Sequence, residues 1–298
     1  MRVFLTGATG YVGSAVLESL VRAGHRVDAL VRSAEGAAKV QARGATPVIG
    51  DLMQPASWRA AAAAADGSIH AAAQSGARAR ALDETAVGVL ISLPAKSNRF
   101  LIYTSGAWVL GPASTPVDET APLNPIEIVS WRPAQEERVL ASASNGGRAV
   151  VIRPGILYGS SRGIVGALLQ DAANSLVRVV GSGGNHWPLV YDRDLGELYA
   201  RIVNTPTASG VYHANDEGDE TVNGIVAALG EHAHTQPSIR HVPLPEARKK
   251  MGPYADALAL DQRVRSPRAQ ALGWTPTLHS VAGNVARLFE EWKRGKAA

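Results

Sequence analysis

Cysteine is absent from this chain of 298 residues, which excludes disulfides, a thiolate nucleophile and zinc sites built on thiolates. No run of about 18 apolar residues occurs, so we expect no membrane-spanning helix and no membrane partner. The chain also lacks a block of charge of one sign. Its 30 basic and 26 acidic residues leave a net charge of +4 and form no basic stripe, so we expect no nucleic-acid partner.

A signal peptide is not expected either, because Met1 leads directly into the short apolar run Val3–Leu5 with no basic segment before a longer one. Together with the missing cysteine, this favours a cytoplasmic location. What the chain does have is a hydrophobic fraction of 46%, which is ample for a packed core. Its length fits one large α/β unit or two modest domains.

Short apolar runs alternate with longer amphipathic stretches over the first 155 residues. The runs predict strands at Arg2–Leu5, Arg26–Val31, Thr46–Ile49, Ser68–Ala72, Phe100–Ser105 and Ala149–Ile152. The stretches between them predict helices at Val12–Ala23, Ala34–Arg43, Ala56–Ala65, Asp83–Ala95 and Pro133–Ala143. Such alternation is typical of a parallel α/β sheet that is wound on both faces by helices.

The alternation weakens beyond about residue 155. A helix at Asp194–Val203 and a strand at Gly210–Ala214 are still predicted, and prolines limit the tail to short helices until Ser280–Lys293. We therefore predict a dinucleotide-binding sheet domain over residues 1–160, which also receives about 185–215. Residues 161–184 and 216–298 would form a smaller substrate lobe over the carboxyl ends of the strands, where open α/β sheets bind ligands.

Glycines mark the end of the first predicted strand, in the segment Gly7-Ala8-Thr9-Gly10-Tyr11-Val12-Gly13. Glycine permits the tight turn, lets backbone N–H groups approach a diphosphate and packs the helix against the strand. The N-terminus of the following helix adds a partial positive charge. The segment predicts a dinucleotide site, and the alternative is a glycine-rich turn that binds no ligand.

The second predicted strand ends in Arg32 and Ser33, about 20 residues past the last of these glycines, where an NAD site carries Asp or Glu. A guanidinium matches a phosphate with two parallel hydrogen bonds and stacks on adenine. Arg32 therefore favours NADP(H) over NAD(H) through the 2′-phosphate. The alternative is an ordinary surface arginine.

Further motifs follow in order along nearly the whole chain: Gly50-Asp51-Leu52, His70-Ala71-Ala72-Ala73, Tyr103-Thr104-Ser105-Gly106-Ala107, Arg153-Pro154-Gly155-Ile156-Leu157-Tyr158-Gly159, Leu189-Val190-Tyr191-Asp192 and Leu272-Gly273-Trp274-Thr275-Pro276. The chain thereby resembles the extended short-chain dehydrogenase/reductases, the NAD(P)-dependent epimerase/dehydratase superfamily. The resemblance implies a Rossmann sheet, an Asp51 carboxylate at the adenine amino group and an alanine stretch along the ribose and diphosphate. It also leaves a homodimer open.

The motif and the resemblance together predict a set of cofactor-binding residues: Gly7, Thr9, Gly10, Tyr11, Val12, Gly13, Arg32, Ser33, Asp51, Leu52, Ala71, Ala72, Ala73, Thr104, Gln135, Pro154, Gly155 and Ile156.

The Tyr-x-x-x-Lys pair of that superfamily is missing, since none of the seven tyrosines is followed by lysine four residues on. The resemblance places Trp131 on the tyrosine position and Gln135 on the lysine position. Neither an indole nor an amide can act as an acid or base near neutral pH. Gly106 falls where the superfamily has a catalytic hydroxyl. Strand alternation makes Thr104 a substitute, and Ser105 stays a candidate.

Two other side chains are candidate proton donors. His186 precedes Trp187-Pro188 in a loop that would face the cleft, and the alternative is a histidine bonded within a structural turn. Tyr158 follows the run that would pass the nicotinamide, and the alternative is a packed aromatic. Arg132 and Glu136 lie one helical turn apart and are expected to pair with each other on a surface. No metal site is expected.

The sequence thus predicts an atypical short-chain oxidoreductase that binds NADP(H) and transfers a hydride to or from a small carbonyl, enone or imine without the Tyr-Lys pair. An NADP(H)-sensing protein without catalysis is the alternative. A nucleotide-sugar epimerase or dehydratase needs the missing tyrosine and is the least supported.

Overall fold

The computed structural model describes residues 1–76, 78–94, 98–145, 147–233 and 236–297. The chain forms two compact units, each built from several segments. The first unit consists of Met1–Ser105, Trp131–Arg153 and Leu195–Tyr212, and the second of Gly106–Ser130, Pro154–Asp194 and His213–Ala298. The domains predicted from the sequence differ from these units, because the prediction assigns residues 106–130 to the sheet domain. The predicted division into domains stays a prediction.

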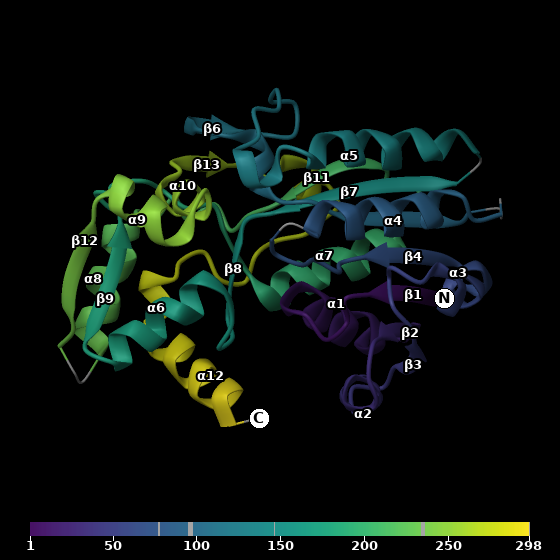
Figure 1. Cartoon of the computed structure of the whole chain (residues 1–298), viewed down its shortest axis with the longest axis horizontal. Helices are drawn as coiled ribbons and strands as arrows, with labels where there is room; N and C mark the ends of the chain where they lie inside the picture. The colour runs from purple at the N-terminus through teal and green to yellow at the C-terminus, as the bar shows by residue number, and fades with distance from the viewer. Residues whose placement is uncertain (77, 95–97, 146, 234–235, 298) are drawn as a thin grey trace. The chain divides into compact units, whose positions relative to one another are not determined.

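Strands and helices alternate in the first unit and its flanks (Figure 1). They are β1 (Arg2–Thr6), α1 (Tyr11–Arg22), β2 (Arg26–Val31), α2 (Ala34–Gln41), β3 (Thr46–Ile49), α3 (Arg59–Ala64), β4 (Gly67–His70), α4 (Ala79–Ile91), β5 (Phe100–Thr104), α5 (Arg132–Ala141), β7 (Arg148–Pro154), α7 (Asp192–Asn204) and β11 (Gly210–Ala214).

The strands form one seven-stranded sheet in the order β11-β7-β5-β4-β1-β2-β3. Neighbouring strands run parallel from β7 through β3. The order reverses beside β1, which is the switch point at which doubly wound sheets bind ligands. The predicted α/β fold class is therefore confirmed.

Alternate side chains of the strands face two helical layers. On one face Phe4, Tyr103 and Val151 pack into a core with residues of α3, α4 and α5. On the other face α1 and α7 pack closely, since a Cβ at Gly196 would stand 2.5 Å from the backbone oxygen of Ala15. Both layers are visible beside the sheet in Figure 1. Burial on both faces explains why the strands read as continuous apolar runs.

The predicted elements of this unit are all present, with shifted ends. The helix predicted at Asp83–Ala95 begins earlier, at Ala79, and ends at Ile91, while Ala95 itself lies outside the described residues. The sequence pattern did not predict the helices Gly163–Ala173 and Val222–His232 or the strands that lie outside this sheet. Three of those strands have three residues each, which are too few for a period to show.

The second unit contains shorter elements: β6 (Ala113–Val117), β8 (Ile156–Tyr158), α6 (Gly163–Ala173), β9 (Leu176–Val180), β10 (Leu189–Tyr191), α8 (Val222–His232), β12 (Ser238–Val242), α9 (Leu244–Met251), α10 (Tyr254–Ala259), β13 (Gln262–Val264), α11 (Pro267–Ala271) and α12 (Val285–Ala297). Its strands pair in parallel as β8 with β10, β9 with β12 and β6 with β13. As the prolines predict, the helices between Pro237 and α12 are short.

Tyr158 lies fully buried in the core of this second unit, among residues such as Leu169, Trp187 and Leu229. Its hydroxyl donates to the backbone oxygen of Leu278 at 3.2 Å, and burial raises its pKa. This arrangement fits a packed aromatic, and the role of Tyr158 as a proton donor stays a prediction.

Asp216 lies beside the Tyr158 hydroxyl and is 1% exposed. Burial raises the pKa of its carboxyl to about 7, although hydrogen bonds from the Gly218 backbone and from Tyr158 lower it. The charge of Glu220 raises this pKa further and that of His279 lowers it. The carboxyl therefore takes up a proton near neutral pH in the folded chain.

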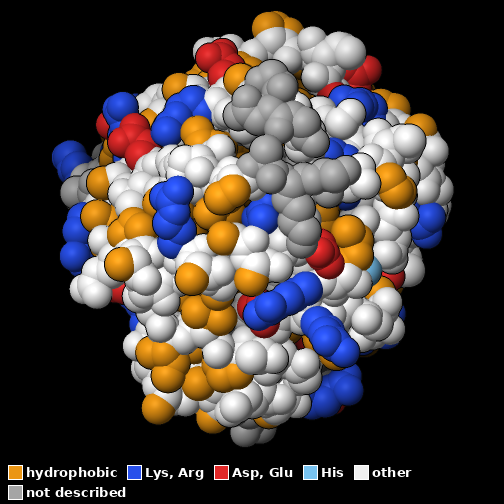
Figure 2. All heavy atoms as spheres, turned by 90° about the vertical axis from the view of Figure 1, so that its right-hand side faces the viewer, with side chains coloured by type: hydrophobic (Ala, Val, Ile, Leu, Met, Phe, Trp, Pro, Cys, Tyr) orange, Lys and Arg blue, Asp and Glu red, His pale blue; other side chains and the backbone are white. Residues whose placement is uncertain are grey.

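Among the described residues, none of the helices combines the length and apolar character that a bilayer crossing requires. Lys and Arg side chains are spread over the face that Figure 2 draws and do not form one continuous stripe. This agrees with the scattered charge of the sequence.

Asp216→Asn is expected to stabilise the protein above neutral pH. The folded-state pKa lies above the ordinary 3.8, so the native chain loses stability as pH rises from about 4 to about 7. Asparagine carries no such penalty, and the gain at pH 8 should be about 2 to 4 kcal/mol. Urea unfolding at pH 5 and pH 8 checks this, and a gain that does not grow with pH would contradict it.

Gly13→Ala is expected to destabilise the first unit. A Cβ at Gly13 would stand 2.0 Å from the backbone oxygen of Gly7, so α1 would be pushed off the turn after β1. Overpacking of this kind costs about 1–3 kcal/mol. Gly230→Ala in α8 is the matched control, because nothing lies within 4 Å of its Cβ. Denaturant unfolding should show opposite signs, since alanine favours an open helix position.

Candidate functional site

A cavity of about 450 Å³ lies at the carboxyl ends of β1, β2, β3 and β4 in the first unit. Its lining follows the ends of these strands and the start of α4: Gly7, Thr9, Gly10, Leu30, Val31, Arg32, Gly50, Asp51, Leu52, Met53, Ala71, Ala72, Ala73, Gln74, Arg78, Ala81 and Leu82. Nine of the residues predicted from the sequence line this one cavity.

The turn between β1 and α1 supplies the diphosphate end of the cavity. Gly7 has φ +76° and sits so close to β4 that a Cβ there would lie 2.6 Å from the backbone of Ala71 and Ala72. Gly10 precedes the first residue of α1, no side chain caps that helix, and its first turn holds no acidic residue. The N-terminus of α1 therefore presents its partial positive charge to an anion without a neighbouring carboxylate in its first turn. These features fit a dinucleotide diphosphate.

The other end of the cavity carries Arg32 and Asp51. Arg32 is exposed at the end of β2, and no carboxylate in the described part of the chain pairs with its guanidinium. Asp51 accepts from the backbone N–H of Met53 at 2.8 Å, which fixes its carboxylate at the cavity. Ser33 is the N-cap of α2, and its hydroxyl accepts a hydrogen bond from the Gly36 backbone N–H at 3.1 Å.

The remaining predicted cofactor residues are not among those that line the cavity. Tyr11, Val12 and Gly13 form the first turn of α1. The Oε1 of buried Gln135 on α5 accepts from Arg138 at 2.8 Å. Pro154, Gly155 and Ile156 lie in the second unit, and their cofactor role stays a prediction.

Two hydroxyls stand where β5 ends. The Oγ1 of Thr104 lies 2.7 Å from the hydroxyl of Tyr199 on α7. Ser105 is 8% exposed, and its Oγ has no hydrogen-bond partner among the described residues. A buried hydroxyl without a partner costs free energy, so Ser105 is the better candidate for a ligand contact.

Arg132, the first residue of α5, lies at the end of β5, a position that the sequence reasoning missed. Its Nη1 donates to the Tyr103 hydroxyl and to the Thr104 backbone oxygen, both at 3.1 Å. The expected surface pair with Glu136 is wrong, because Glu136 is buried and bonds Arg153 with a shortest distance of 2.5 Å. Only the neighbouring Trp131, in the position discussed above, could have drawn attention to Arg132.

A buried polar chain continues inward from Tyr103. Its hydroxyl donates to Asp83 at 3.0 Å, and the Oγ1 of Thr6 lies 2.7 Å from Nδ1 of His70. Burial raises the pKa of Tyr103, so the phenol keeps its proton at neutral pH. These contacts connect the ends of β1, β4 and β5 to α4.

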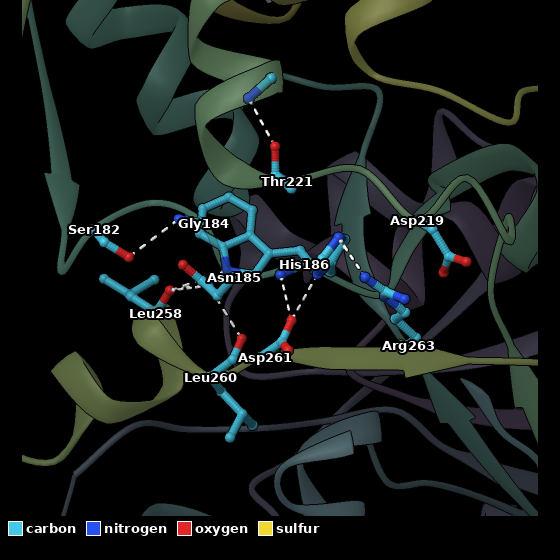
Figure 3. A network of polar contacts seen from close by, with 12 residues as sticks. Ser182, Gly184, Asn185, His186, Asp219, Thr221, Leu258, Leu260, Asp261 and Arg263 are labelled. Carbon is cyan, nitrogen blue, oxygen red and sulfur yellow. Dashed lines mark hydrogen bonds and ion pairs between the residues drawn. The ribbon is translucent and has the colours of Figure 1, made fainter. Parts of the chain in front are cut away.

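His186 is held on both ring nitrogens in the second unit (Figure 3). Its Nδ1 lies 2.8 Å from Asp261 Oδ1, and its Nε2 lies 3.0 Å from Nη2 of Arg263. Arginine only donates, so Nε2 accepts and Nδ1 carries the proton. This arrangement fits a structural turn, and the role of His186 as a proton donor stays a prediction.

No group of three or more His, Asp or Glu side chains positioned for a metal ion occurs within the described ranges.

The comparisons with known proteins point in the same direction as this geometry. The model of the NAD dependent epimerase/dehydratase family matches residues 3–215. An uncharacterized protein of Schizosaccharomyces pombe is 33% identical over 96% of this chain and 98% of its own length. A 3-diazoavenalumate denitrifying reductase of a Streptomyces species is 30% identical over 96% and 100%. A 2-alkyl-3-oxoalkanoate reductase of Stenotrophomonas maltophilia is 27% identical over 77% and 76%.

Solved structures share the fold. A UDP-glucose 4-epimerase of Thermus thermophilus, in complex with NAD, has a TM-score of 0.81 at 20% identity over 98% of this chain and 99% of its own. A human epimerase family protein with NADPH has a TM-score of 0.75 at 19% identity over 97% and 99%. With the family model covering most of the chain, and with the glycine turn at the switch point of its sheet, the protein belongs to the NAD-dependent epimerase/dehydratase family.

Proposed function

We propose that the protein is an NADP(H)-dependent oxidoreductase that transfers a hydride to or from a small carbonyl, enone or imine. The observation that carries the proposal is the cavity of the first unit, with an anion-binding turn at Gly7–Gly10 and an unpaired guanidinium at Arg32. When bound, the nicotinamide supplies the hydride chemistry, and the protein supplies binding and orientation.

The residues of the cavity divide the binding task. The N–H groups at the start of α1 hold the diphosphate, and Gly7 leaves room for it against Ala71. Arg32 binds the 2′-phosphate through its guanidinium, which forms no ion pair with a described carboxylate. The fixed Asp51 carboxylate accepts from the adenine amino group.

The proton of such a reaction is taken from water or from a side chain other than a Tyr-Lys pair. Trp131 stands immediately before α5 and Gln135 within it, and neither exchanges a proton near neutral pH. The Tyr103 and Tyr199 hydroxyls have raised pKa values through burial and hold their protons. Thr104 and Ser105 can hydrogen-bond a substrate oxygen without ionising.

The relatives support a redox reaction. The names of two of them state a reductase, one of these on a 3-oxo acid. The solved neighbours include complexes with NAD and with NADPH, so the choice of NADP(H) rests on Arg32. Trp131 and Gln135 favour a second candidate, a protein that binds NADP(H) without turning over a substrate.

Arg32→Ala is expected to weaken NADPH binding about 10- to 100-fold, the value of hydrogen bonds to a charged group, and NADH binding by less than about threefold. Titration calorimetry with both cofactors checks this. Arg26→Ala, an exposed arginine at the opposite end of β2, is the control and should change neither affinity. Equal losses for NADPH and NADH would refute the NADP assignment.

Turnover separates the two candidate functions. NADPH oxidation, followed at 340 nm with a panel of ketones, enones and imines, is expected to depend on protein concentration and to fall with Arg32→Ala. Tight NADPH binding without turnover on the whole panel would favour the binding protein instead.

A further inference from the structure

Arg132 is a half-buried guanidinium with no acidic partner. Of the protein groups described, it contacts the neutral Tyr103 hydroxyl, the Thr104 backbone oxygen and the Trp131 ring, whose centroid is 4.7 Å from its Cζ. No described carboxylate lies within ion-pair distance of it. The Glu136 carboxylate one turn along α5 is fully engaged by Arg153.

Arg153 on β7 and Arg132 on α5 differ in whether a carboxylate pairs with them. Arg153 is 5% exposed and neutralised by Glu136 through three hydrogen bonds. Arg132 loses part of its hydration, but no described carboxylate contacts it, and Asp83 is reached only through the Tyr103 hydroxyl. Partly desolvated charges are costly unless they are paired, so an uncompensated arginine points to a negative charge from outside. Only Nη1 is used by the described residues, which leaves the Nε and Nη2 donors for that charge.

Ser105 provides a second, independent observation. Its backbone N–H donates to the Ile152 oxygen at 2.8 Å and so continues the β5–β7 ladder by one residue. Strand alternation then puts the Ser105 side chain on the same face as Tyr103, whose hydroxyl contacts Arg132. The Ser105 hydroxyl is buried and without a partner in the described part of the chain. The unpartnered Ser105 hydroxyl therefore lies on the same face of the strand end as the Tyr103 hydroxyl, which Arg132 contacts.

We propose that Arg132 and Ser105 bind the carboxylate of the substrate, so that the substrate is an oxo acid. The guanidinium fork matches a carboxylate with two hydrogen bonds, and the serine hydroxyl adds a third donor. A single unpaired guanidinium matches the one charge of a carboxylate better than the two charges of a phosphate. Neither Arg153 nor Arg138 is available as a second cation, because the first is paired with Glu136 and the second donates to Gln135. The inference rests on the proposed oxidoreductase function and gives it a substrate class.

The test compares medium-chain 2-oxo, 3-oxo and 4-oxo acids with their methyl esters and with phosphate monoesters of the same length. Calorimetric binding to the full chain with NADP⁺ present is expected to favour at least one acid over its ester by about tenfold or more. Arg132→Gln keeps donors for Tyr103 and Thr104 but removes the charge. It should abolish this preference while the affinity for the ester stays within about twofold.

Arg132→Lys should keep part of the preference for the acid, because it keeps the charge and loses the fork. Ser105→Ala should weaken acid binding by a smaller factor. Arg26→Gln, an exposed arginine at the start of β2, is the control and should leave acid and ester binding unchanged. Melting temperatures of all variants show whether a loss of binding reflects unfolding.

Acids that bind no tighter than their esters, a preference that survives in Arg132→Gln, or stronger binding of the phosphates would each overturn the inference. NADPH affinity, measured in parallel, keeps this outcome apart from the proposed function. If NADPH fails to bind, the oxidoreductase function fails. If NADPH binds normally to wild type and Arg132→Gln while acids show no preference, only the carboxylate site fails.

Discussion

The close approach between the turn after β1 and the backbone of α1 and β4 is the constraint on which the candidate site depends. Gly13 lies against the Gly7 oxygen, and Gly7 lies against Ala71 and Ala72, at distances where a Cβ cannot fit. These contacts bring an uncapped helix N-terminus to the switch point of the parallel sheet. Packing alone therefore places a helix N-terminus, with its partial positive charge, at the cavity.

Two arginines without an ion pair to a described carboxylate add positive charge at the ends of strands. The buried Arg153 and the partly exposed Arg265 are neutralised by Glu136 and Asp219. Arg32 and Arg132 are not neutralised by any described carboxylate. Both stand at the carboxyl ends of strands, β2 and β5, where a parallel sheet presents its ligands. The account assigns one to a cofactor phosphate and the other to a substrate carboxylate, and leaves the hydride chemistry to the nicotinamide.

The alternation of apolar runs and amphipathic stretches was enough to predict the sheet and most of its helices, because strands such as β1, β4 and β7 are buried along nearly their whole length. The sequence could predict that one site holds Gly7, Arg32 and Asp51, because each follows the end of a predicted strand by one or two residues. The position of Arg132 could not be predicted. Its spacing to Glu136 suggested that these two residues form an ion pair, but Glu136 pairs with Arg153 instead. The contact of Thr104 with Tyr199 and the missing partner of Ser105 depend on packing between distant segments, which no local pattern contains.

The 2′-phosphate is the most specific element of this account, and it can be tested without any substrate. Calorimetric titration with 2′,5′-ADP and with 5′-AMP isolates the contribution of that phosphate at the end of β2. The account predicts that 2′,5′-ADP binds about tenfold or more tightly than 5′-AMP, as expected for hydrogen bonds to a charged group. Equal affinity for the two nucleotides would contradict it.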